Sequence, residues 1–115
     1  MGLSFAEICI DAHDPERLGQ WWSNILGWPK HTDSDGDVVL TPPPGQGPIW
    51  LFLEVPDDKV VKNRLHLDFT PDDQQAEVDR LIGLGACHVD IGQGEQSWVV
   101  LADPEGNEFC VLAAE

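Results

Sequence analysis

Residues that could do acid–base chemistry occupy equivalent places in two similar halves of the chain. Glu7 lies twenty residues before Gly27, and His66 lies nineteen residues before Gly85. In each half the glycine follows a leucine at the end of a helical pattern, so the two halves match to within one residue. A carboxylate beside an imidazole can pass a proton to or from a substrate. We therefore predict Glu7, His66 and the nearby Asp68 as catalytic residues that share one site.

A second group of candidates lies in the strand pattern over residues 49–55. The odd-numbered residues of this segment are all aliphatic, so we expect their face to pack against a helix. The opposite face would then present Trp50, Phe52 and Glu54 to a cleft, where two rings beside an acid could bind a flat organic molecule. Trp98 is a further binding candidate, because its neighbours do not fix the face on which it lies.

The elements that must position these side chains follow one order in both halves: a strand, a helix and three more strands. Asp14 and Pro15 suit the cap and the first position of the first helix, and Pro71 opens the second. In the first half we predict a helix from residue 15 to 26 and strands at 3–12, 28–32, 38–41 and 49–55. In the second half we predict a helix from residue 71 to 84, with Val78, Leu81 and Ile82 buried, and strands at 64–70, 86–91, 96–102 and 108–113.

This order predicts an α+β fold in which two βαβββ repeats form a half-barrel around a cleft. At 115 residues the chain is expected to be a single domain. The first repeat covers about residues 1–57 and the second about residues 62–115. Duplication would direct residues at equivalent strand positions, such as Glu7 and His66, to one place inside the cleft.

Several short segments carry a family resemblance through their order and spacing. In chain order they are Asp14-Pro15, Trp21-Trp22, Leu26-Gly27-Trp28, Lys62 to Asp68 (KNRLHLD), Leu84-Gly85-Ala86 and Asp103 to Phe109 (DPEGNEF). Together they resemble the vicinal oxygen chelate superfamily, which includes glyoxalase I, bleomycin-resistance proteins and extradiol dioxygenases. The resemblance covers essentially the whole chain and is closest to short glyoxalase-like proteins. Because this fold hosts many chemistries, the resemblance implies the fold and leaves the reaction open.

The resemblance also implies a set of metal ligands. Metal-dependent members take four ligands from the first and fourth strands of the two repeats, which here would be Glu7, Glu54, His66 and Cys110. Carboxylate, imidazole and thiolate can all bind zinc, iron or manganese. The set departs from the family pattern, with one histidine where two are usual and a cysteine in place of a glutamate. We therefore favour a site without a cofactor and keep a divalent metal as the alternative.

Composition limits the partners. The chain has 21 acidic and 6 basic residues, a formal net charge of −15, so nucleic acid and anionic membrane are not expected partners. Its three cysteines lack CxxC spacing, and no signal peptide or apolar run of membrane-spanning length is visible, which favours a reducing cytoplasm. We expect a small-molecule ligand, and a homodimer that covers exposed strand edges.

Three functions remain open at this point. The first is a metal-dependent lyase, isomerase or dioxygenase in which the metal polarises oxygens of the substrate. The second is a metal-free, drug-sequestering protein of the bleomycin-resistance type that binds an aromatic ligand on Trp50 and Phe52. The third is a metal-free enzyme in which His66 works with Glu7 or Asp68 as an acid–base pair.

Overall fold

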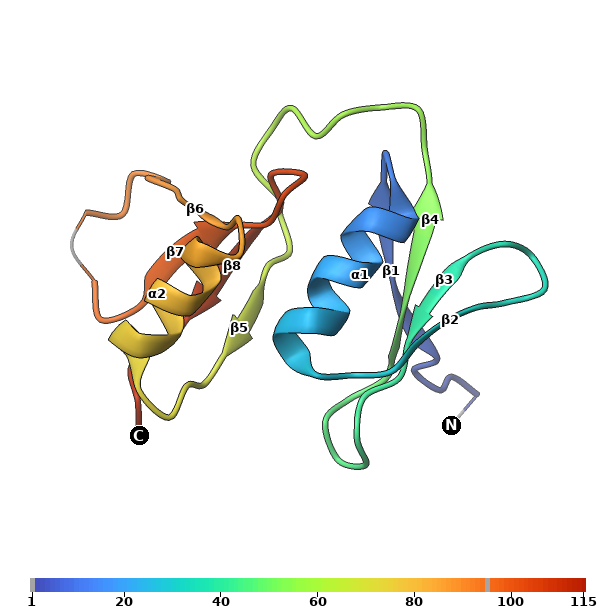
Figure 1. The fold of residues 1–115 in the computed structure, drawn as a ribbon, viewed down its shortest axis with the longest axis horizontal. Coiled ribbons are helices and arrows are strands. Elements are labelled where there is room, and N and C mark those ends of the chain that lie inside the picture. Colours follow the sequence, from blue (N-terminus) through green and yellow to red (C-terminus); the bar gives the residue numbers. More distant parts are fainter. Residues whose placement is uncertain (1, 95) are drawn as a thin grey trace. The chain divides into compact units, whose positions relative to one another are not determined.

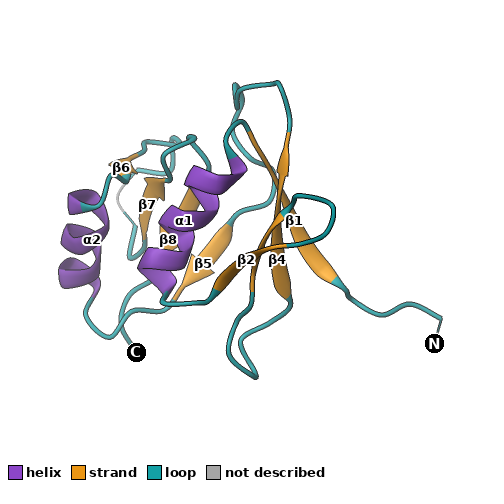
Figure 2. Ribbon diagram, turned by 45° about the vertical axis from the view of Figure 1, so that its right-hand side comes forward, coloured by secondary structure: helices purple, strands orange, loops and turns teal. Residues whose placement is uncertain are grey.

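The computed structural model describes residues 2–94 and 96–115 and divides into two compact units. The first unit ends at Asp58 and the second begins at Lys59. Each unit contains one long helix and one four-stranded sheet (Figures 1 and 2). The predicted α+β fold with two βαβββ repeats is therefore confirmed. Among the described residues, no helix combines the length and the apolar character that crossing a bilayer requires.

The first unit consists of β1 (Glu7–Ala12), α1 (Pro15–Leu26), β2 (Lys30–Thr32), β3 (Val38–Leu40) and β4 (Ile49–Glu54). Its sheet has the order β1-β4-β3-β2, with β1 parallel to β4 and the other pairs antiparallel. The second unit repeats this plan with β5 (Leu67–Phe69), α2 (Gln74–Gly83), β6 (Cys87–His88), β7 (Val99–Ala102) and β8 (Glu108–Val111). Its sheet has the order β5-β8-β7-β6, with β5 parallel to β8.

Several strands are shorter than predicted because their ends have no partner. Glu7 pairs with Ile49, and the segment before Ile49, residues 42–48, contains four prolines that cannot donate to a ladder. Residues 3–6 therefore remain irregular. In the same way β5 begins at Leu67, opposite Phe109, so His66 lies just before the paired strand.

Local sequence signals account for both helices. Asp14 accepts a hydrogen bond from the Arg17 backbone N–H, and Gly27 ends α1 with a φ of 72°. The second helix begins later than predicted, because Asp73 rather than Pro71 supplies the cap by accepting from the Ala76 N–H. Its buried residues are Val78 and Leu81, whereas the predicted core residue Ile82 is 37% exposed.

The core of the first unit corrects the face predicted for β4. Trp50 is 4% exposed and Phe52 is fully buried. The Trp50 ring lies edge-on to Trp22 of α1 and to Trp28, each at a centroid distance of 5.3 Å. The prediction that Trp50 and Phe52 face a cleft is wrong, because these rings form the core beneath α1.

The close packing of α1 on the sheet explains why the aromatic face of β4 is buried and the aliphatic face is not. Gly19 of α1 approaches the sheet so closely that an added Cβ would lie 2.6 Å from Val38 and 3.5 Å from Phe52. Trp21 and Trp22 follow Gly19 on the same helix, and the Trp22 ring packs against Trp50, so the face of β4 that carries Trp50 and Phe52 lies against α1. The aliphatic residues Ile49, Leu51 and Leu53 lie on the opposite face and remain partly exposed.

Replacing Trp50 with alanine should unfold the first unit rather than weaken a ligand. Removing a buried aromatic side chain costs about 3–5 kcal/mol of the free energy of unfolding. The matched control is Phe5→Ala, because Phe5 is 74% exposed, and its effect should stay within about 0.5 kcal/mol. Urea denaturation followed by circular dichroism measures both. An unchanged unfolding midpoint for Trp50→Ala would contradict the core assignment.

Candidate functional site

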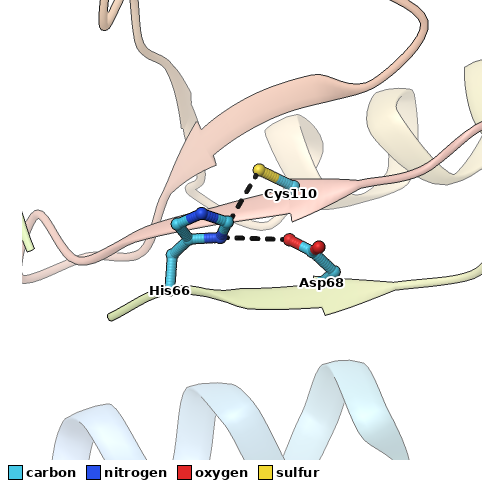
Figure 3. Close-up of side chains that lie close together, drawn as sticks. All are labelled: His66, Asp68 and Cys110. Atoms are coloured by element: carbon cyan, nitrogen blue, oxygen red, sulfur yellow. Dashed lines mark hydrogen bonds and ion pairs between the residues drawn. The ribbon is translucent and has the colours of Figure 1, made fainter. Parts of the chain in front are cut away.

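Three of the predicted site residues lie together on the second sheet. Figure 3 shows His66 and Asp68 rising from the β5 segment next to Cys110 of β8. The Nδ1 atom of His66 lies 3.1 Å from Asp68 Oδ1 and 3.9 Å from Cys110 Sγ. The metal-ligating atoms of all three residues lie within 4.8 Å of one another. We call these residues the β5–β8 cluster.

Strand alternation explains how the cluster forms. The half-buried Phe69 of β5 contacts Phe109 of β8 edge-on, and Phe109 is buried in the core of the second unit. Because successive side chains of a strand point to opposite faces, His66 and Asp68 emerge on the other side of the sheet. Asp68 pairs in register with Cys110, which places the carboxylate and the thiol on the same face. We call this face of the second sheet the distal face.

Exposure differs strongly within the cluster. The side chains of His66 and Asp68 are 39% and 45% exposed, whereas Cys110 is buried. A ligand arriving at the distal face would therefore meet the imidazole and the carboxylate first. The thiol lies beneath them, against the sheet.

The environment of Cys110 keeps its thiol protonated. Burial raises the pKa of Cys110, and the charge of Asp68 and a hydrogen bond to its carboxylate raise it further, to about 11. Lys62 opposes this shift only partly. Because the thiolate is the nucleophilic form of cysteine, Cys110 is not an activated nucleophile at neutral pH.

The His66–Asp68 contact restricts what the imidazole can do. A carboxylate at Nδ1 holds the proton on that nitrogen, which leaves Nε2 as a hydrogen-bond acceptor or proton acceptor. This arrangement orients the ring by a partner two residues away on the same strand segment. In chemical terms, the pair can accept a hydrogen bond from a ligand or take a proton from it.

The donor atoms of the cluster also fit a small divalent cation. Donors bound at about 2.0–2.3 Å around a tetrahedral ion lie roughly 3–4 Å from one another. The observed separations of 3.1 Å and 3.9 Å from His66 Nδ1 match that spacing. With a cation present, these three residues would hold it, and the cation would supply a Lewis acid.

Glu7 and Glu54 of the first unit do not lie close together, although the predicted ligand set requires them to share one metal ion. Glu7 begins β1 opposite Ile49, whereas Glu54 ends β4 opposite Ala12, at the far end of the strand pair. By alternation Glu54 belongs to the face of Trp50 and Phe52, and Glu7 belongs to the other face. Glu54 therefore cannot share a metal with Glu7, and that part of the predicted ligand set is wrong. The pairing of Glu7 with His66, which belong to different units, stays a prediction.

Trp98 remains a predicted binding residue. It lies just before β7 and is partly buried, and its indole N–H donates to Gln93 Oε1 at 2.9 Å. It is the only tryptophan of the second unit. The other four are buried in the first unit.

Sequence reasoning missed Glu108, a buried acid on the same strand as Cys110. Glu108 is 7% exposed, forms an ion pair with Lys59 at 2.5 Å and accepts a hydrogen bond from the Asn63 N–H at 2.7 Å. Burial alone would raise the pKa of Glu108, but the hydrogen bonds from Lys59 and Asn63 and the charges of Lys59 and Lys62 lower it overall. The basic cluster at residues 59–64 was the available signal, because a buried acid needs such a partner.

Two acidic segments are turns rather than sites. Asp103 accepts hydrogen bonds from the N–H groups of Glu105 and Asn107, as turn chemistry predicts. Asp33 does the same for Asp35 and Asp37. Although the three acids at 33–37 lie close enough to hold an ion, the turn explains their arrangement.

Comparison with known proteins identifies the fold family. A family model described as a glyoxalase-like domain matches residues 7–112. No curated protein sequence gives a significant match to the chain.

Solved structures share the fold at low sequence identity. The fosfomycin resistance protein FosX from Listeria monocytogenes is 17% identical, with 100% of this chain and 94% of that chain covered and a TM-score of 0.72. TnmS3, an antibiotic-binding protein from a Streptomyces species, is 17% identical, with coverages of 100% and 99% and a TM-score of 0.68. A glyoxalase/bleomycin resistance protein/dioxygenase superfamily member from Sphaerobacter thermophilus is 16% identical, with coverages of 98% and 99% and a TM-score of 0.70. At such identities the likeness shows the fold alone.

Alkylation should distinguish the buried thiol from the exposed ones. At pH 8, iodoacetamide should label the exposed Cys87 well before Cys110, because Cys110 is buried and its pKa is raised to about 11. Peptide mass spectrometry after short pulses measures both rates. In urea the two cysteines should react alike. Equal labelling in the folded protein would contradict the protonated, buried state of Cys110.

Removing the partner of Glu108 should destabilise the second unit. Lys59→Ala leaves a buried carboxylate without its counter-charge, which costs about 3–5 kcal/mol at neutral pH. Arg64→Ala is the matched control, because Arg64 is exposed and is not among the charges that lower the pKa of Glu108.

The pH dependence of this effect has a definite sign. Because folding lowers the pKa of Glu108, its ionised carboxylate stabilises the fold above the ordinary value of 4.5 and loses that effect as the pH falls below it. Urea denaturation at several pH values should therefore show the Lys59→Ala defect shrinking in acid. A defect that stays constant from pH 7 to pH 3 would contradict this ion pair.

Proposed function

The chain belongs to the glyoxalase-like domain family, and from this premise we propose that it binds a small organic molecule on the distal face of its second sheet. In this proposal His66 and Asp68 contact the ligand, and Cys110 forms the floor beneath them. The observation that carries the proposal is the β5–β8 cluster itself. Two polar side chains remain partly exposed above a buried thiol, on a sheet whose other face is filled by the core.

The hydrogen-bonding capacity of the cluster selects the kind of ligand. With the Nδ1 proton directed at Asp68, both Nε2 of His66 and the second carboxylate oxygen of Asp68 accept hydrogen bonds. A ligand that supplies donors, such as hydroxyl, phenol or amine groups, would satisfy them. The net charge of −15 disfavours polyanions. We therefore propose a neutral or cationic ligand with donor groups.

Apolar contacts would come from β7. Val100 pairs in register with Cys110, so it lies on the same face as the cluster, and it is only partly buried. Trp98 stands two residues earlier in the chain. An aliphatic side chain on the face that carries two acceptors suits a ligand with an apolar ring or chain, and in this proposal the Trp98 indole also contacts that ligand. This replaces Trp50 and Phe52, which cannot serve because they lie in the core.

Proteins of similar fold support a small-molecule role. One is described by its resistance to fosfomycin and another as an antibiotic-binding protein. Both descriptions concern small organic compounds rather than nucleic acid or membranes. The similarity does not extend to a particular compound, so the proposal for this chain stops at the ligand class set by its own residues.

A second candidate function is proton transfer by His66, and the hydrogen bond to Asp68 favours it. A carboxylate that holds Nδ1–H fixes the tautomer, so that Nε2 is the nitrogen that can take a proton from a ligand. In this role Asp68 is a positioning residue and His66 is the catalytic residue. A reaction, rather than binding alone, would show as a slow chemical change of a bound compound that is lost in His66→Gln.

An NMR fragment screen tests the proposed site. Hydroxylated and amine-bearing aromatic fragments should shift the amide signals of residues 66–68 and 110 and the Trp98 indole signal. His66→Ala should weaken such fragments about tenfold or more, a loss of at least ~1.4 kcal/mol. His88→Ala is the control, because His88 is an exposed histidine on β6 of the same sheet. Fragments that bind equally well to His66→Ala would contradict the proposal.

A further inference from the structure

We infer that Glu108 is a positioning residue for the proposed site: through Lys59 and Asn63 it fixes the segment that carries His66, so that the imidazole stands over Cys110 before a ligand arrives. Where it concerns ligand binding, the inference rests on the proposed function. Its structural part depends only on contacts within the second unit, which begins at Lys59. We call the contacts of Glu108 with Lys59 and Asn63 the Glu108 tie.

The Glu108 tie uses both oxygens of one buried carboxylate. Glu108 Oε2 forms an ion pair with Lys59 Nζ at 2.5 Å, and Glu108 Oε1 accepts a hydrogen bond from the Asn63 backbone N–H at 2.7 Å. The side chains of Glu108 and Lys59 are both largely buried, so water competes little for the ion pair. One acid at the start of β8 therefore holds both ends of the segment 59–63.

The turn before β8 holds the same segment a second time. Asn63 Nδ2 donates to Asn107 Oδ1 at 3.3 Å, and Asn107 Nδ2 donates to Asp103 Oδ2 at 3.0 Å. The buried Asp103 also accepts the backbone N–H of Asn107, so the turn is itself well bonded. Asn63 is thus bound both to Glu108 and to a fixed turn beside it.

His66 lies between two fixed points of the chain. Asn63 stands three residues before it, and Leu67, where β5 begins to pair with β8, is the next residue. Only residues 64–66 separate the Glu108 tie from the paired strand. Figure 3 shows His66 on this segment with its ring turned toward Cys110. The place of the ring is therefore set by the tie on one side and by β5 on the other.

Hydrophobic packing does not hold this segment. Val60, Val61 and Leu65 are 88%, 76% and 89% exposed. A segment whose large apolar side chains stay in water gains little from burial, and it opens readily unless polar contacts restrain it. The Glu108 tie supplies such contacts, and this is the observation that gives Glu108 a role in placing His66.

The tie also lies on the same face as the proposed site. Glu108 stands two residues before Cys110 on β8, and side chains two apart on a strand share one face. The segment 59–63 therefore borders the distal face at the Glu108 end. A buried ion pair contributes little net stability compared with apolar residues of the same size, but its directed bonds select one arrangement of the chain.

A double variant removes the tie without leaving a buried charge unpaired. Lys59→Met with Glu108→Leu should keep the free energy of unfolding close to that of the unmodified protein, because apolar residues of similar volume replace both charges. The readout that needs no ligand is the NMR cross-relaxation signal between the His66 ring protons and the Cys110 β protons. We expect this signal to fall about fivefold or more in the double variant. An unchanged signal would overturn the inference.

An insertion variant keeps the test decisive if the double variant does not fold. Two glycines inserted between Arg64 and Leu65 leave the Glu108 tie intact but uncouple it from His66. Both neighbours of the insertion are exposed, and surface insertions of this length cost little stability. The His66–Cys110 signal should fall here as well, and an unchanged signal in this variant would also overturn the inference.

Ligand affinity separates positioning from general stability. Phenol and benzylamine serve as probes, and their affinity should fall about fivefold or more in the double variant and in the insertion variant. The control is Val78→Ala, because Val78 is buried in α2 of the same unit and lies outside the tie. Val78→Ala should lower the free energy of unfolding yet leave probe affinity and the His66–Cys110 signal of the folded protein unchanged. Equal losses of affinity in Val78→Ala would show that Glu108 acts through stability alone and would overturn the inference.

The two proposals fail separately. If neither probe shifts residues 66–68 of the unmodified protein but the His66–Cys110 signal falls in the variants, the binding function is overturned and the positioning of His66 by Glu108 stands. If the probes bind at His66 with equal affinity in every variant and the signal is unchanged, the positioning role is overturned and the binding function stands.

Discussion

In each unit of this protein, one helix covers one face of a four-stranded sheet, and strand alternation then decides which side chains remain for function. In the first unit the tryptophans of α1 and the close approach at Gly19 draw Trp50 and Phe52 into the core. In the second unit the contact of Phe69 with Phe109 plays the corresponding part. Everything proposed for the distal face follows from this allocation, because His66, Asp68 and Cys110 are the residues that the core leaves on the other side.

Much of this arrangement could be predicted from local sequence signals. The repeat of strand, helix and three strands follows from alternation, helix caps and turn residues, and Asp14, Gly27 and the turn at Asp103 behave as those signals indicate. The face of β4 could not be predicted in this way, because both of its faces are apolar. The face of β4 that is buried depends on how α1 packs, with Gly19 close to Val38 and Phe52 and the Trp22 ring against Trp50. The burial of Glu108 could not be predicted from local signals either, because its partners Lys59 and Asn63 lie more than forty residues away in the sequence.

The second unit contains a buried acid, Glu108, and a half-exposed pair, His66 and Asp68, and these serve different roles. Glu108 is satisfied by its ion pair and backbone hydrogen bond, so it stabilises the fold and offers little to a ligand. His66 and Asp68 have each other as partners yet keep a substantial part of their surface exposed. A protein that needed these two residues only for stability would gain little from a pair so accessible to water, because exposed ion pairs contribute about 0–1 kcal/mol. Their exposure above Cys110 is more useful to a ligand than to the fold.

A crystal structure of the protein soaked with a fragment found by NMR tests this account most directly. The account predicts that the fragment lies on the distal face of the second sheet, in contact with His66 and Asp68. A fragment bound elsewhere, with none at His66, Asp68 and Cys110, would contradict the claim that this cluster is the functional site.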